Sequence, residues 1–148
     1  MASLNTPASG HGNQTEHYAS GLIIDFNVFL SGNATEVTRL SKIKQAVQII
    51  DRLNNKIDLY GPCTTYFKSL PKGKSFSELW NDALIFVNYS PAATKGFYGA
   101  THSNDKDICI SAWCLDTHNK WVIAATIVHE LAHVAGAPGG VLTLLKRQ

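Results

Sequence analysis

Long apolar runs, charge clusters and cysteine pairs are all scarce in this chain of 148 residues. No stretch approaches the roughly 18 apolar residues that a membrane-spanning helix requires. The 13 Lys and Arg residues are scattered and the formal net charge is only +2, so the chain lacks the basic patch of a nucleic-acid-binding surface. We therefore expect an ordinary soluble globular protein that binds neither nucleic acid nor membrane.

Cysteine is rare as well, because Cys63, Cys109 and Cys114 are odd in number and form no C-x-x-C pair. This spacing favours three reduced, mostly buried thiols, while a Cys109–Cys114 disulfide or a cysteine metal ligand stays open. Residues 1–20 lack the basic start and the apolar run of a secretory signal peptide, and their composition is typical of a flexible leader. We expect a cytoplasmic protein, unless it is exported by a route that needs no signal peptide.

Residues 21–148 predict a single α+β domain, because strand-like and helix-like segments are mixed along the chain. Apolar residues recur every three or four positions from Val37 to Ile57, which predicts an amphipathic helix. Asn33 and Glu36 have the spacing of a capping box at its start. A short helix is expected in "SFSELWNDA", and strands are expected at 21–32, 84–89, 96–102 and 107–113, the last two as a hairpin.

A second long helix is expected from Asp116 onward, capped by Asp116 or Thr117 and ended by Gly136. Its residues from 121 to 135 are apolar on nearly every face, so it belongs in the centre of a domain. The predicted fold is a small mixed or antiparallel sheet packed on the amphipathic helix and on this central buried helix. We also assign the three tryptophans to the core: Trp80, Trp113 and Trp121.

The central helix contains the sequence His-Glu-Leu-Ala-His at residues 129–133. His129 and His133 are four residues apart, so both imidazoles project from one helix face and can bind one metal ion. Glu130 projects about 100° away and can reach a metal-bound water. The pattern predicts a Zn²⁺ site in which Glu130, as general base, takes a proton from zinc-bound water while the hydroxide attacks a carbonyl. The alternative is a pair of core histidines bonded to carbonyls, for which an apolar helix is a poor environment.

Residues 96–140 resemble the zincin metallopeptidases, in which the H-E-x-x-H helix lies across a cleft from a sheet-edge strand. The resemblance implies that His129 and His133 are zinc ligands, that Glu130 is the general base, and that the substrate is a peptide or protein. It also implies that "DICISAW" or "GFYGATH" is the edge strand, which pairs with extended substrate. The segment "HELAHVAGAPGG" is similar to compact metallopeptidase domains of secreted bacterial effectors and toxins, which implies an inhibitor or immunity protein as a partner.

The sequence departs from the zincins at the third zinc ligand. The position that holds His or Asp in metzincins is Gly139, and no Glu, Asp, His or Cys follows His133, so the gluzincin ligand is missing too. His118 would lie on the same helix about 16 Å from His129, which argues against it. The upstream candidates are His102, Asp105, Asp107, Asp116 and His118. Two tyrosines, Tyr89 and Tyr98, are candidates for stabilising an oxyanion, although their positions are more typical of half-buried strand residues.

Two explanations for the missing ligand stay open. Either an upstream residue completes the site, or the domain is truncated at its C-terminus, where "VLTLLKRQ" stands. One choice of codons for that segment gives Pro-His-Ala-Ala-Glu-Lys-Ala after a shift of reading frame, and the nucleotide sequence tests this idea. The chain is thus predicted to be a zinc-dependent peptidase, weakened where the third ligand is missing. The alternative is a non-catalytic zincin-like domain that acts by binding a protein partner.

Overall fold

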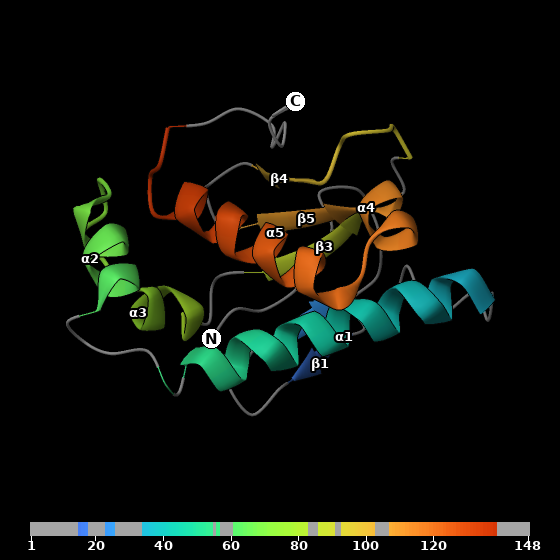
Figure 1. Ribbon diagram of the computed structural model, residues 1–148, viewed down its shortest axis with the longest axis horizontal. Helices are drawn as coiled ribbons and strands as arrows, with labels where there is room; N and C mark the ends of the chain where they lie inside the picture. The colour runs from blue at the N-terminus through green and yellow to red at the C-terminus, as the bar shows by residue number, and fades with distance from the viewer. Residues whose placement is uncertain are drawn as a thin grey trace.

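The computed structural model describes residues 15–17, 23–25, 34–54, 56, 61–82, 86–90, 93–102 and 107–138. These residues form an α+β fold, as predicted (Figure 1). The strands are β1 (Thr15–His17), β2 (Ile23–Asp25), β3 (Phe86–Ser90), β4 (Gly99–His102) and β5 (Asp107–Ser111). The helices are α1 (Ala34–Asn54), α2 (Pro62–Ser69), α3 (Phe76–Trp80), α4 (Ala112–Thr117) and α5 (Lys120–Val134).

The five strands form one mixed sheet in the order β1-β2-β3-β5-β4. β3 pairs in parallel with both β2 and β5, whereas the β1–β2 and β4–β5 pairs are antiparallel. The predicted hairpin of β4 and β5 is confirmed, and residues 103–106 between them lie outside the described part of the chain. The order leaves β4 at one edge of the described sheet, while β5 is paired on both sides. Of the two candidate edge strands, the edge position therefore belongs to the segment "GFYGATH".

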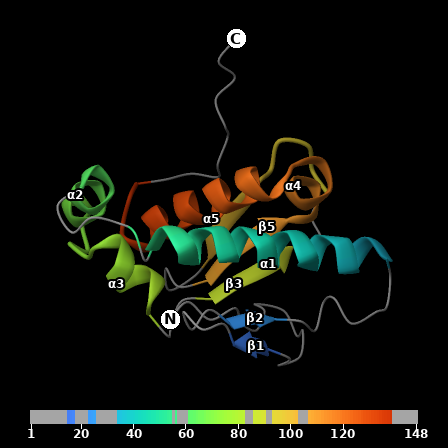
Figure 2. The ribbon, with the colours of Figure 1, turned by 60° about the horizontal axis from the view of Figure 1, so that its bottom comes forward.

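Helix α1 confirms the amphipathic helix and packs along α5, and the two helices lie side by side in both views (Figures 1 and 2). Ile43, Val47 and Ile50 on its inner face are fully buried. Each buried side chain of this size stabilises the fold by about 1.5–3 kcal/mol. Near the two ends of the apolar stripe, Val37 and Leu53 are exposed, because the stripe there extends beyond the surface that α5 and the sheet cover. The predicted capping box depends on residues outside the described part of the chain.

Helix α3 lies beside the end of α1, and α2 packs on α3 (Figure 1). Helix α2 was not among the elements predicted from the sequence, because the residues around its start, "YGPC", are typical of a break. Pro62 occupies the first turn of α2, where its missing N–H needs no partner and its fixed φ favours a helix. The expected short helix is α3, whose cap Ser75 accepts a hydrogen bond from the backbone N–H of Glu78. Trp80 at its end is fully buried, and its indole N–H donates to Asp51 on α1 over 2.6 Å.

The prediction of one helix from Asp116 onward is wrong. Two helices are present, because α4 ends at Thr117 and α5 begins at Lys120. The cap of α5 is Asn119, whose side-chain oxygen accepts hydrogen bonds from the two N–H groups at the start of the helix. An Asx cap starts a helix by satisfying these N–H groups, so the chain turns at Asn119.

The assignment of all three tryptophans to the core is also wrong. Trp121 is 62% exposed, because it lies in the first turn of α5, and the buried positions of this helix begin with Ile123. Trp113 is half-buried. The three cysteines are present as thiols, as expected, and Cys109 and Cys114 are buried. Among the described helices, none has the length and apolar character needed to cross a membrane.

Candidate metal centre

Helix α5 places the His-Glu-Leu-Ala-His sequence between α1 and the β4–β5 hairpin. Ile127 and Leu131 on the same helix are fully buried and fix its rotation against the core. This rotation leaves His129 exposed and His133 half-buried, whereas Glu130 is only 1% exposed. The two imidazoles and the carboxylate therefore differ sharply in their access to water.

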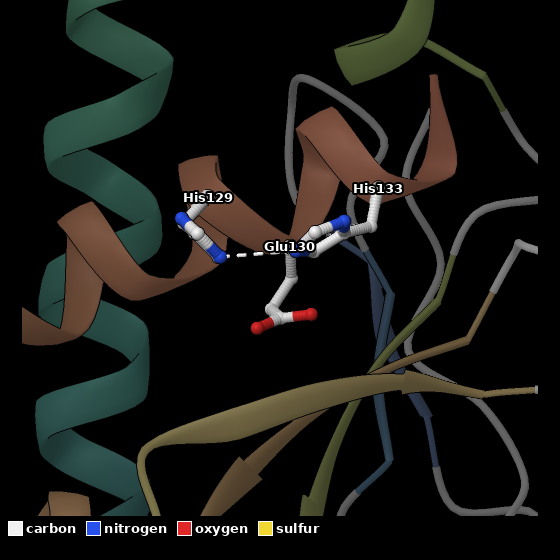
Figure 3. Close-up of side chains that lie close together, drawn as sticks. All are labelled: His129, Glu130 and His133. Carbon is white, nitrogen blue, oxygen red and sulfur yellow. Dashed lines mark hydrogen bonds between the residues drawn. The ribbon is translucent and has the colours of Figure 1, made fainter. Parts of the chain in front are cut away.

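The two imidazoles lie next to each other on one side of α5 (Figure 3). Their Nε2 atoms are 3.0 Å apart. Two nitrogens bound to one tetrahedral zinc ion at about 2.0–2.1 Å would be separated by about 3.3 Å. The observed spacing is close to that value, so small rotations of the rings would suit a shared metal ion. A carboxylate oxygen of Glu130 lies within 4.8 Å of both ligand nitrogens.

The C-terminal turn of α5 orients the His133 ring. Gly136 adopts φ 97°, and the N–H groups of Gly136 and Ala137 bond to the carbonyls of His133 and Ala132. This is a Schellman turn, and it confirms Gly136 as the residue that ends the helix. The turn brings the Ala137 carbonyl to 3.1 Å from Nδ1 of His133. Because a carbonyl only accepts, Nδ1 carries the proton and Nε2 of the neutral ring keeps its lone pair for a metal ion.

The electrostatic environment of His129 also favours a neutral ring. Partial burial lowers the pKa of His129 from its usual value, and the neighbouring His133 lowers it further, because two charged imidazoles would repel each other. A metal ion binds only the neutral form of imidazole. The site therefore favours neutral imidazoles over a pair of charged histidines, and the neutral form is the one that a metal ion can bind.

Thr101 on β4 contacts Glu130 from the sheet side of α5. The Thr101 hydroxyl lies 2.8 Å from Oε2 of Glu130 and 3.1 Å from its backbone oxygen. A hydroxyl has one proton to donate. We assign it to the carboxylate, because that contact is the shorter one and a carboxylate oxygen is the more basic acceptor. Figure 3 shows the carboxylate pointing from α5 toward the sheet, below the two facing imidazoles. A carboxyl group buried to this extent needs such hydrogen-bond partners.

Of the upstream candidates for a third ligand, the two with described side chains, Asp116 and His118, have partners elsewhere. Asp116 accepts two hydrogen bonds from Arg39, and His118 contacts Tyr98 and Thr117. His118, which was expected on the helix of His129, is instead the C-cap of α4. Asp105 and the side chains of His102 and Asp107 lie outside the described part of the chain. Among the described residues, the one group of three possible ligands is His129, Glu130 and His133.

Neither tyrosine candidate for an oxyanion donor is placed at the centre by a described contact. The Tyr98 ring packs edge-on against Trp113, and its hydroxyl lies 3.3 Å from Nε2 of His118. This position agrees with the alternative interpretation, an aromatic residue on a half-buried strand end. The side chain of Tyr89, on β3, is not described.

Sequence reasoning missed Thr101, the residue on β4 that contacts Glu130. The available signal was the pair Gly99 and Thr101, since alternate residues of a strand share a face and a glycine there permits close approach. Comparison with known proteins adds no family: no protein-family model, no curated protein and no solved structure matches this chain. The function has to be argued from the geometry of the site.

Proposed function

We propose that this protein is a zinc-dependent peptidase whose metal ligands include His129 and His133 and whose general base is Glu130. The observation that carries the proposal is the pair of Nε2 atoms 3.0 Å apart, beside a buried carboxylate within 4.8 Å. Zinc, when bound, would polarise the scissile carbonyl and acidify a water molecule. The donor set fits zinc, which binds imidazole readily and keeps an open position at catalytic sites.

The protein's own groups have separate roles in this proposal. His133 is oriented by the Ala137 carbonyl so that its Nε2 lone pair can face the metal, and the lowered pKa of His129 favours the neutral ring that a metal ion can bind. Glu130 takes the proton from the attacking water and returns it to the departing amine. Its burial excludes bulk water from the carboxylate, which strengthens the interactions there.

The edge strand β4 supplies a place for a peptide substrate. β4 lies opposite α5, and no described strand pairs with its outer side. An extended peptide can add to such an edge through main-chain hydrogen bonds, and its side chains then alternate toward and away from the cleft. The scissile carbonyl would lie between β4 and the imidazoles, near Glu130.

The zinc content of the purified chain after dialysis tests the metal site, with His133→Ala as the control. We expect about one zinc per chain, lost in the control, because removal of one imidazole leaves a single histidine ligand. Hydrolysis of a casein or peptide-library substrate then tests the reaction, with Glu130→Gln as the variant. We expect kcat to fall by roughly 10²–10⁴-fold while zinc is retained.

Two results separate this function from its rival. If the parent retains zinc and Glu130→Gln cleaves as fast as the parent, Glu130 is not the base. If the parent retains no zinc and cleaves nothing, the peptidase proposal fails. A non-catalytic domain that binds a protein partner would then be the better account of the fold.

A further inference from the structure

Strand β4 and helix α5 run in the same direction with matching contacts. A Cβ placed on Gly99 would lie 3.2 Å from Cγ2 of Thr126, and Thr101 bonds to Glu130. The two strand residues are two apart and the two helix residues are four apart. These intervals correspond to about 6.7 Å along a strand and about 6 Å along a helix. The register of β4 on α5 therefore places the Thr101 hydroxyl directly against Glu130.

Glu130 lies close enough to the imidazoles to become a metal ligand. Its carboxylate oxygen is within 4.8 Å of the nitrogens of His129 and His133, whereas ligand atoms on one tetrahedral zinc are about 3.3 Å apart. A shift of about 1.5 Å would thus suffice. The described chain supplies two imidazoles, so a metal ion there has coordination positions that a nearby carboxylate can fill. A base that ligates the metal can no longer accept the proton of a metal-activated water.

We propose that Thr101 is a positioning residue that anchors Glu130 to β4 and so keeps its carboxylate out of the metal coordination shell. The inference rests on the proposed function, because it assumes a metal ion at His129 and His133. It makes an unusual prediction: loss of the Thr101 hydroxyl strengthens zinc binding and weakens catalysis. A residue with a merely structural role would weaken both or leave both unchanged.

The test compares Thr101→Val, which keeps the shape and removes the hydroxyl, with Thr101→Ser, which keeps the hydroxyl. Zinc affinity is measured by competition with a chromophoric chelator, and kcat and KM are measured with the peptide substrate. We expect Thr101→Val to bind Zn²⁺ about tenfold more tightly, a change as large as outer-shell groups usually cause but opposite in sign, because here the released carboxylate becomes an added ligand. Its kcat should fall by at least about tenfold at an unchanged KM, since a general base contributes more than this. Thr101→Ser should behave like the parent within about twofold.

Thr126→Val is the matched control. Thr126 is also a buried threonine at the contact between α5 and β4, one helical turn before Glu130. Its hydroxyl donates to the Val122 carbonyl. The control loses one hydroxyl from the same contact region and should leave zinc affinity and kcat unchanged. If it changes them as much as Thr101→Val does, the effect is general packing and the inference fails.

A measurement without metal separates this inference from the proposed function. Urea unfolding of the metal-free Thr101→Val, Glu130→Met and doubly substituted proteins gives the coupling between the two side chains. We expect the double substitution to change the unfolding equilibrium constant about tenfold less than the product of the two single effects predicts. Additive effects would show that Thr101 does not hold Glu130, whether or not the protein is a peptidase.

The zinc measurement also decides when no hydrolysis is found. An inactive parent would refute the peptidase proposal, while tighter zinc binding by Thr101→Val would still support the anchoring of Glu130. Equal or weaker zinc binding by Thr101→Val overturns the inference, even in a fully active enzyme. If the parent retains no zinc, acquisition of zinc by Thr101→Val supports the inference and failure to acquire it overturns it.

Discussion

Addition of one methyl group at Gly99 should disturb both the sheet and the candidate site. A Cβ at this position would lie 2.5 Å from the backbone oxygen of Cys109 on β5 and 3.2 Å from Cγ2 of Thr126 on α5. The first contact is with backbone, so no side-chain rotation can relieve it. In Gly99→Ala, β4 has to move away from β5, from α5, or from both.

The size of the effect follows from these distances. Ordinary carbon contacts begin at about 3.5 Å, so the clash with the carbonyl requires a displacement approaching 1 Å. Overpacking of this kind costs about 1–3 kcal/mol. For a chain of this length we expect Tm to fall by about 3–10 °C. The same displacement would stretch the 2.8 Å hydrogen bond between Thr101 and Glu130.

Differential scanning calorimetry of the metal-free protein measures this effect, with Gly96→Ala as the control. Gly96 has φ 86°, but a Cβ there meets nothing within 4 Å, so its substitution carries only backbone strain of about 1 kcal/mol. Gly99→Ala should therefore lose more stability than Gly96→Ala. An unchanged Tm for Gly99→Ala, or a larger loss for Gly96→Ala, would refute the close approach of β4 to its neighbours.

Two further predictions concern groups outside the metal centre. Hydrogen bonds from Arg39 hold the pKa of Asp116 below its usual value. A lowered folded-state pKa stabilises the protein above the unfolded pKa of about 3.9 and loses this effect as pH falls through the folded value. Because the Asp116 side chain is 39% exposed, Asp116→Asn should lower the unfolding free energy by only about 0.5–1 kcal/mol at neutral pH. If the parent and Asp116→Asn differ by the same unfolding free energy at about pH 2, this account is contradicted. Burial raises the pKa of Cys114 to about 11 and also raises the pKa of the half-buried Cys63. A disulfide reagent should therefore label Cys63 first in the folded protein. Rapid labelling of Cys114 would show that α4 opens.

The elements that the sequence predicted well are those whose pattern is local. The apolar stripe of α1 and the nearly all-apolar segment of α5 each extend over several turns, and both helices are present. Errors occurred where a single residue decides a boundary. Pro62 starts a helix instead of only ending one, and Asn119 separates α4 from α5 by taking the cap of the second helix. The exposure of Trp121 follows from that boundary, because it moves the residue into a first turn.

The site shows the same division between local and distant information. The spacing of His129, Glu130 and His133 requires only helix geometry, and the structure brings their ligand atoms within 4.8 Å. Thr101 is 29 residues away from Glu130, and their contact depends on the order of β4 and β5 and on the missing side chain at Gly99. Such a contact is set by sheet register, which a single sequence does not specify.

The two functional parts of the centre differ in how firmly the described protein holds them. Glu130 is buried and bonded to the opposite strand, so the base stays in place without metal. The imidazoles lie on the accessible side of α5, and the other described candidates are engaged elsewhere, Asp116 with Arg39 and His118 with Tyr98. Water or residues outside the described ranges must therefore complete the coordination of a bound ion. Since a catalytic zinc ion normally has three protein ligands, retention of the metal rather than placement of the base should limit activity. Variants should accordingly be ranked first by zinc affinity, and kcat should be compared only among those that hold the ion.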